Sequence, residues 1–265
     1  MQNSPAHATK HISELDYLLP DRSTRVLVHQ DDSTANSTGR TVWLGAQVLS
    51  VYLHDLLSSK SSPAAQQRPR AIDLGSGTGL VALSLASMGY DALATDVDMI
   101  VQGVLHRNVE ANAAKLSGRI KAETLDWCTF DRATWSASTS ANVDSVDLLT
   151  TADTVYDPSL SAPLLQTLHG LSLLFAKPAP PPVYLALEAR DPALISAFFA
   201  LAASEPFGFK CSRVDPDRIR KLVEAKDGTL GWQDESDWEG VEVWKMVLSK
   251  KEVARAKAER KAAAG

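Results

Sequence analysis

Three glycines at alternate positions follow a short apolar run that contains an aspartate. The segment is Ala71-Ile72-Asp73-Leu74-Gly75-Ser76-Gly77-Thr78-Gly79. Because glycine accepts a positive φ and lets a ligand approach the bare backbone, this turn indicates a small-molecule site at the end of a strand. Leu80 stands where the third glycine of a Gly-x-Gly-x-x-Gly dinucleotide motif belongs. A nicotinamide-dependent oxidoreductase is therefore disfavoured.

Further acidic residues follow the next two strand-like segments. Asp96 ends one of them, and Asp126, at the end of the other, is followed directly by Trp127. The first carboxylate can accept hydrogen bonds from two ribose hydroxyls, as in dinucleotide sites. The second can accept from an adenine amino group while the indole offers an apolar face. Carboxylates at successive strand ends suit a nucleoside that carries a positive charge, and they suit a polyphosphate poorly.

The elements that must position these residues alternate between strands and helices. We expect strands at 71–74, 92–95, 120–125, 146–151, 183–187, 207–214 and 241–248, and helices at 42–57, 79–88, 99–114, 161–175 and 192–203. This alternation predicts an α/β fold, a Rossmann-like seven-stranded and mainly parallel sheet with helices on both faces. The last two strands lack a long helix between them, so we expect them to pair antiparallel at one edge.

The chain divides into three predicted regions. Residues 1–37 form an N-terminal arm, mobile over its first 20 or so residues, with a short strand at 25–29. Residues 38–248 form the α/β domain, in which we expect 131–144 to be irregular. Residues 249–265 form a basic tail rich in helix-forming residues but without an apolar stripe, so we expect a frayed, solvated helix.

Composition excludes several classes of protein. The chain has 265 residues, 45% of them hydrophobic and 22% charged, which is typical of a globular protein with a sizeable core. Two cysteines cannot form a disulfide framework, and the six histidines lack ligand spacing, so we expect no metal. The start of the chain does not resemble a secretory signal, and no apolar run is long enough to span a membrane. We expect a cytoplasmic or nuclear protein, monomeric by default.

The net charge of −5 is unevenly distributed. The stretch 249–265 carries six basic and two acidic residues, a charge of +4, which leaves −9 for the rest of the chain. Nucleic-acid binders present basic surfaces to the phosphate backbone, so we do not expect a nucleic-acid partner. An acidic body suits a basic protein partner better.

The glycine turn and the acidic residues resemble motifs of known enzymes. The glycine turn with Asp73, together with Asp96 and Asp126-Trp127, resembles the cofactor motifs of class I S-adenosylmethionine-dependent methyltransferases. Two other segments resemble the lysine methyltransferase group called methyltransferase family 16. Thr38-Gly39-Arg40-Thr41-Val42-Trp43 is similar to its Gly-x-x-x-Trp entry segment, and Asp153-Thr154-Val155-Tyr156 to its acidic-x-x-aromatic motif after the fourth strand. The segment 185–190 is similar to the ending of its fifth strand, and the resemblance covers residues 38–248.

The resemblance implies a binding site for S-adenosyl-L-methionine. Trp43 would cover the cofactor, Asp96 would hold the ribose, and Asp126 with Trp127 would hold the adenine. The residues expected at the methionine end are Asp73, Gly75, Ser76, Gly77 and Gly79. Plainer roles compete for some of these residues, since Asp126 can simply start a turn and Trp43 can pack a helix.

The resemblance also implies transfer of a methyl group to a lysine side chain of a protein substrate. Asp153 and Tyr156 would line the mouth through which the amine enters. Asp153 could orient the ammonium, and Tyr156 could accept a hydrogen bond or offer its ring face. Two alternatives stay open: methyl transfer to histidine or a small amine, and a non-catalytic module that binds the cofactor or a partner.

Overall fold

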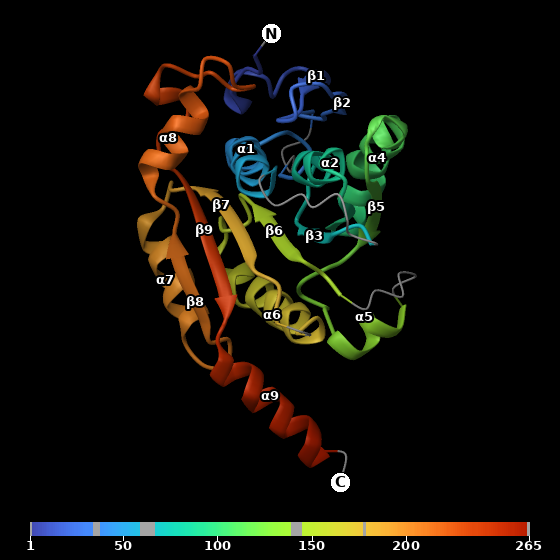
Figure 1. The fold of residues 1–265 in the computed structure, drawn as a ribbon, viewed down its shortest axis with the longest axis vertical. Helices are drawn as coiled ribbons and strands as arrows, with labels where there is room; N and C mark the ends of the chain where they lie inside the picture. The colour runs from blue at the N-terminus through green and yellow to red at the C-terminus, as the bar shows by residue number, and fades with distance from the viewer. Residues whose placement is uncertain (1, 34–37, 59–66, 139–144, 177–178, 264–265) are drawn as a thin grey trace.

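The strand-like segments assemble into one sheet in the order β5-β4-β3-β6-β7-β9-β8 (Figure 1). The computed structural model describes residues 2–33, 38–58, 67–138, 145–176 and 179–263. The strands are β3 (Arg70–Leu74), β4 (Asp91–Asp96), β5 (Arg119–Thr124), β6 (Leu148–Ala152), β7 (Val183–Glu188), β8 (Phe209–Arg213) and β9 (Val241–Leu248). β3 to β7 run parallel, whereas β9 pairs antiparallel with both β7 and β8. This arrangement confirms the predicted fold.

Helices cover both faces of the sheet (Figure 1). They are α1 (Leu44–Ser58), α2 (Leu80–Ser87), α3 (Asp98–Ile100), α4 (His106–Asn112), α5 (Arg132–Ser138), α6 (Pro158–Leu174), α7 (Pro192–Ala203), α8 (Pro216–Glu224) and α9 (Lys250–Ala263). A π-helical turn, η2 (Val101–Leu105), joins α3 to α4, and short 3-10 turns lie at η1 (Ala6–Ala8), η3 (Ala113–Lys115) and η4 (Glu235–Asp237). Tyr184 and Ala186 of β7 face the core under α1 and α2, while Leu185 faces the core over α6 and α7. The sheet is thus buried on both sides, as its apolar strands require.

Three helices begin with the same pair of residues. In α6, α7 and α8 an aspartate precedes a proline, and its side chain accepts a hydrogen bond from a backbone amide of the first turn. The carboxylate satisfies an amide that has no partner within the helix, and proline at the first helical position loses nothing because its amide would be unpaired. The local sequence therefore determines where these three helices begin.

Residues 2–20 are ordered, which corrects the expectation of a mobile arm. β1 (Glu14–Leu18) pairs antiparallel with β2 (Arg25–His29), and Tyr17 of β1 is buried. Asn108 and Asn112 of α4 lie beside β2. Their side-chain oxygens accept hydrogen bonds from the backbone amides of His29 and Leu27, at 2.7 and 2.9 Å. The two amide side chains thus pair the outer edge of β2 as a third strand would.

The N-terminus is also tied to a distant loop. The backbone amide of Asn3 donates to the carbonyl of Thr229 at 2.8 Å, and the indole of Trp232 donates to the carbonyl of Asn3 at 2.8 Å. The second pair is 229 residues apart in sequence. The N-terminal segment and the loop that follows α8 are therefore joined at the end of the molecule opposite α9 (Figure 1).

The structure differs from the sequence predictions in three other elements. α5 lies within the stretch 131–144 that was expected to be irregular, and the remainder of that stretch, 139–144, lies outside the described residues. α8 was not predicted. α9 is not wholly solvated, because Glu252 and Ala256 are buried against the domain and Glu252 lies 3.2 Å from His169 of α6. Over the described residues, no helix is both long and apolar enough to cross a membrane.

The chain reverses its direction of travel across the sheet next to β3. From β3 it proceeds outward through β4 to β5, and it then returns to place β6 on the other side of β3. In open α/β sheets, ligands bind beyond the carboxyl ends of the strands at such a reversal. Asp73 and the glycine turn, Asp96 and Asp153 lie at the carboxyl ends of β3, β4 and β6.

Candidate active site

The glycine turn after β3 has a backbone that side chains would obstruct. Gly75, Gly77 and Gly79 have φ values of 63°, 56° and 86°. A Cβ on Gly77 would lie 2.9 Å from the carbonyl oxygen of Gly39, and one on Gly75 would lie 2.7 Å from Thr154 Cγ2. Both the conformation and the close approach therefore require glycine at these two positions.

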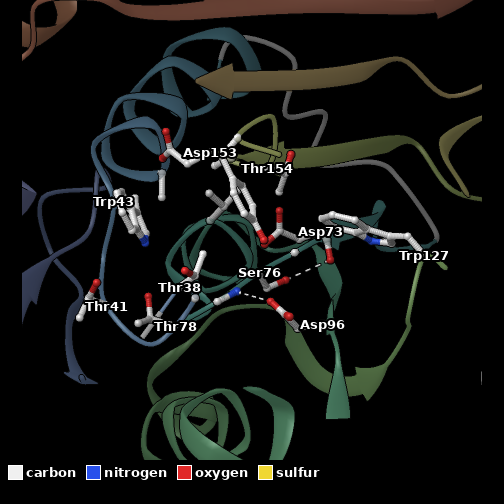
Figure 2. Close-up of a pocket in the computed structure, with 17 residues that line it drawn as sticks. Thr38, Thr41, Trp43, Asp73, Ser76, Thr78, Asp96, Trp127, Asp153 and Thr154 are labelled. Atoms are coloured by element: carbon white, nitrogen blue, oxygen red, sulfur yellow. Dashed lines mark hydrogen bonds between the residues drawn. The ribbon is translucent and has the colours of Figure 1, made fainter. Parts of the chain in front are cut away.

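A pocket opens at this turn, with about 620 Å³ of space including its open mouth. Nine of the eleven residues predicted for the site line it: Trp43, Asp73, Gly75, Ser76, Gly77, Asp96, Trp127, Asp153 and Tyr156. Trp43 and Asp153 lie on one side, and Trp127 lies on the opposite side (Figure 2). Segments that are far apart in sequence thus form one cavity.

The other two predicted residues lie outside the lining. Gly79 precedes α2, where its positive φ starts the helix. Asp126 follows β5, and its Oδ1 accepts a hydrogen bond from the backbone amide of Cys128 at 2.8 Å. This is a turn role of the kind weighed against adenine binding, so the assignment of Asp126 to adenine stays a prediction.

Asp73 is buried on the floor of the pocket. Its Oδ1 accepts a hydrogen bond from the hydroxyl of Thr150 on the neighbouring β6, at 2.7 Å. Burial raises the pKa of Asp73 to about 7, and the hydrogen bonds from Thr150 and Ser76 only partly oppose that effect. A cation bound nearby would lower this pKa and stabilise the charged form.

Asp96 is held by the backbone on both oxygens. Its Oδ2 accepts from the amide of Gly77, and its Oδ1 accepts from the amide of Val97, each at 2.8 Å (Figure 2). Burial raises the pKa of Asp96 to about 6, against these two hydrogen bonds. Each carboxylate oxygen has a further lone pair, so the oriented group can still accept hydrogen bonds from two hydroxyls.

Asp153 has a strained backbone, with a φ of 56°. The left-handed conformation turns its carboxylate toward the beginning of α1, where a Cβ on Gly45 would lie 2.5 Å from Oδ2. Oδ2 is buried and has no hydrogen-bond partner of good geometry among the described residues. Burial, together with the charge of Glu188, raises the pKa of Asp153 to about 7, and backbone amides at Ala46, Glu188 and Gly45 oppose the shift. The carboxylate therefore lies enclosed against the start of α1, on the wall of the pocket.

Tyr156 and Trp43 form the aromatic part of the pocket. Tyr156 is 53% exposed, and partial burial with the carboxylates of Asp96 and Asp157 raises its pKa, so its hydroxyl stays neutral. Trp43 carries two cations on its ring, since Lys10 Nζ lies 3.6 Å and Arg190 Cζ lies 5.0 Å from the ring centroid. The rim of the pocket thus attracts ammonium and guanidinium groups.

Sequence analysis missed several threonines that line the pocket, namely Thr38, Thr41, Thr78 and Thr154. Thr154 is buried, its methyl group faces Gly75, and its hydroxyl lies 2.7 Å from that of Thr151. All four lie inside segments already singled out: Thr38 and Thr41 in the entry segment, Thr78 in the glycine turn and Thr154 in the acidic-x-x-aromatic motif. These threonines could have been predicted from their positions within the motifs, but not from the chemistry of their side chains.

No group of three or more His, Cys, Asp or Glu side chains is placed to hold a metal ion in the described part of the chain. Glu188 and Arg190 form an ion pair, as the sequence allowed. The charged groups of the pocket are therefore mainly carboxylates, with Arg190 and Lys10 at its rim.

A family model described as "Lysine methyltransferase" matches residues 22–204, which is more than half of the chain. Among curated proteins, the chain is 29% identical to mouse Methyltransferase-like protein 22 over 60% of this chain and 42% of that protein. It is 27% identical to Protein-lysine N-methyltransferase EFM6 of Saccharomyces cerevisiae over 68% of this chain and 76% of that protein. It is 31% identical to Protein N-lysine methyltransferase METTL21A of Xenopus tropicalis over 49% of this chain and 54% of that protein.

Solved structures share the fold. SMU.776 in complex with SAH superimposes with a TM-score of 0.53 at 10% identity, over 89% of this chain and 56% of that one. The METTL16 methyltransferase domain superimposes with a TM-score of 0.50 at 13% identity, over 84% of this chain and 73% of that one. At these identities the likeness concerns the fold alone.

Proposed function

The chain belongs to the lysine methyltransferase family, and from this we propose that it transfers a methyl group from S-adenosyl-L-methionine to the side-chain amine of a lysine in a protein substrate. The curated relatives EFM6 and METTL21A are named as protein-lysine methyltransferases. The observation that carries the proposal is the pocket itself, which is lined by a side-chain-free glycine turn, the buried carboxylate of Asp73, the partly exposed carboxylate of Asp96, and Asp153 and Tyr156 at its mouth.

The residues of the pocket fit a cationic nucleoside cofactor. The glycine turn leaves room that a Cβ would fill, and Asp73 and Asp96 each have an elevated pKa that a positive ligand would lower. We assign the ribose hydroxyls to Asp96, the methionine end to the glycine turn with Asp73 and Ser76, and the adenine face to Trp127. When bound, the cofactor supplies a methyl group that is already activated on a sulfonium sulfur.

The protein's part in the reaction is to position and desolvate the amine. Asp153 lines the pocket and attracts the incoming ammonium through its charge, and Tyr156 offers a neutral hydroxyl and an exposed ring face. The ammonium releases its proton to solvent, after which the amine lone pair forms the N–C bond as the C–S bond breaks. Burial at the mouth favours the neutral amine that this step needs.

The substrate protein is proposed to present its lysine in a basic segment. Asp153 and Glu188 place negative charge around the mouth, and the chain apart from its tail carries −9. Transfer to histidine or a small amine uses the same cofactor chemistry and is the second candidate. Amino-acid analysis of the labelled product distinguishes methyllysine from methylhistidine.

The test combines cofactor binding with methyl transfer. Calorimetric titration with S-adenosylhomocysteine should show saturable binding, and labelled S-adenosylmethionine should label lysine in proteins of a cell extract. Asp153→Asn should retain S-adenosylhomocysteine affinity within a few-fold while transfer is lost. If Asp153→Asn abolishes binding, Asp153 is a cofactor ligand, and if the folded wild type binds nothing, the enzymatic proposal fails.

A further inference from the structure

A lysine of this chain already lies at the rim of the pocket. Lys10 Nζ is 3.6 Å from the centroid of the Trp43 ring, and Trp43 lines the pocket. The side chain of Lys10 is half-buried, although it lies in a turn close to the N-terminus. Neither the fold nor the proposed reaction requires an amine at this place.

One buried side chain fixes the position of Lys10. Gln30 donates from its Nε2 to the carbonyls of Thr9 at 2.9 Å and Ile12 at 2.8 Å, on either side of Lys10. Its Oε1 accepts from the amide of Val42 at 2.7 Å, the residue before the tryptophan. The turn that carries the lysine and the segment that carries the aromatic ring are therefore held together by hydrogen bonds shielded from water.

The charges around Lys10 match those proposed for an acceptor. The carboxylates of Asp32, Glu188 and Asp153 attract its ammonium, and Asp153 is the residue assigned above to attract the incoming amine. Partial burial and the nearby Arg190 lower the pKa of Lys10, which increases the fraction of neutral amine. Its flexible four-carbon stem lets Nζ move along the rim while the backbone turn stays in place.

We propose that Lys10 is a methyl acceptor of this enzyme, methylated within its own chain. This inference rests on the proposed function. The Lys10 ammonium gives its proton to solvent, its Nζ lone pair forms a bond to the methyl carbon of S-adenosylmethionine, and the C–S electron pair stays with sulfur as S-adenosylhomocysteine leaves. Trp43 accommodates the product, because a methylated ammonium is still attracted to the face of an indole.

The test is peptide mass spectrometry of the purified full chain after incubation with S-adenosylmethionine. We expect methyl groups on the peptide that contains Lys10, at a first-order rate that does not change with protein concentration. Lys10→Arg keeps a cation on Trp43 and should lose this signal. Lys121→Arg, which alters an exposed lysine of the edge strand β5, is the matched control and should keep it.

The outcomes separate this inference from the proposed function. Labelling of an extract protein with Lys10 left unmodified would overturn the inference and leave the proposed function intact. A rate that rises with protein concentration would also overturn it, because one chain would then be modifying another. Failure of the folded protein to bind S-adenosylhomocysteine would overturn both.

Discussion

Backbone amides of Gly77 and Val97 orient the two carboxylate oxygens of Asp96. Its loss would remove the proposed ribose acceptor and would also release the amide of Gly77 from its partner. We expect Asp96→Ala to weaken S-adenosylhomocysteine binding by about 1–3 kcal/mol, or roughly 5- to 150-fold, the scale of a lost hydrogen bond to a charged group. Calorimetric titration measures this change directly.

Asp98 provides the matched control for that prediction. It stands two residues further along, is exposed, and accepts a hydrogen bond from Thr124 at 3.3 Å. Asp98→Asn should leave the affinity unchanged within error. Equal losses in both variants would mean that the general negative charge of this surface binds the cofactor, not the oriented carboxylate.

Asp153 combines a strained backbone with a position in the pocket. Its positive φ aims the carboxylate at α1, and such a conformation persists only where the surroundings enforce it. The acidic-x-x-aromatic pattern identified this residue in the sequence. The strain, the contact with Gly45 and the unpartnered Oδ2 depend on the packing of β6 against α1, so no local pattern could reveal them.

At the scale of elements, the glycine turn packs closely against the segment that precedes α1. A Cβ on Gly77 would lie 2.9 Å from the carbonyl oxygen of Gly39. Gly77→Ala should therefore both destabilise the fold, by at least the ~1–2 kcal/mol that a left-handed alanine costs, and abolish S-adenosylhomocysteine binding. Thermal denaturation and titration of the same variant measure the two effects.

A substitution at Gly89 tests the effect of backbone strain without a steric contact. It has a φ of 90°, but a Cβ there would meet nothing within 4 Å. Gly89→Ala should cost a similar ~1–2 kcal/mol of stability while binding is preserved. If Gly89→Ala also lost binding, general destabilisation would explain both variants.

The C-terminal helix α9 is attached through a buried carboxylate. Glu252 lies 3.2 Å from His169 and also forms an ion pair with Arg255, and its side chain is 6% exposed. Glu252→Ala should destabilise the protein by about 1–3 kcal/mol, because it removes a buried carboxylate and leaves the half-buried His169 and Arg255 without their acceptor. Glu259→Ala, at an exposed position on the same helix, should stay within ~0.5 kcal/mol, as measured by urea denaturation.

The regular elements could be predicted from the sequence because their signals are local. The apolar runs of β3 and β7 and the start of α7 at Pro192 depend only on neighbouring residues. The Asp-Pro pairs that begin α6 and α8 are equally local signals, but we expected α6 to begin at 161 and did not predict α8. β1 was missed because its burial depends on long-range partners, Asn108 and Asn112 binding β2 and the 229–232 loop binding Asn3. The docking of α9 was missed for a similar reason, since its polar sequence hides the contact between Glu252 and His169.

For the whole molecule, the buried carboxylates link stability to pH. The pKa of Asp153 rises from 3.8 in the unfolded chain to about 7 in the folded one, so the native state binds this proton more tightly. The contribution of Asp153 to the free energy of unfolding therefore falls as the pH rises from about 4 to about 7. His29 and His169, whose pKa values are lowered by burial, act in the opposite direction near pH 6.5.

A comparison with Asp153→Asn isolates the carboxyl group, since asparagine also tolerates a left-handed backbone but does not titrate. Measured by chemical denaturation over a pH series, the stability of the wild type relative to this variant should decline between pH ~4 and ~7 and be level outside that window. A constant difference across the series would show that Asp153 does not carry this linkage.

The hydrogen bonds between Asn3 and the 229–232 loop also have a consequence for biosynthesis. The indole that binds Asn3 belongs to a residue translated 229 positions later. At ~5–20 residues per second, the beginning of the chain waits on the order of 10–50 s for this partner to be made. A nascent chain halted before residue 229 can build much of the central sheet and can pair the side chain of Asn3 with Leu18, but the backbone of Asn3 lacks its two partners in the 229–232 loop. The contact between Asn3 and this loop therefore forms only after most of the strands have been synthesised.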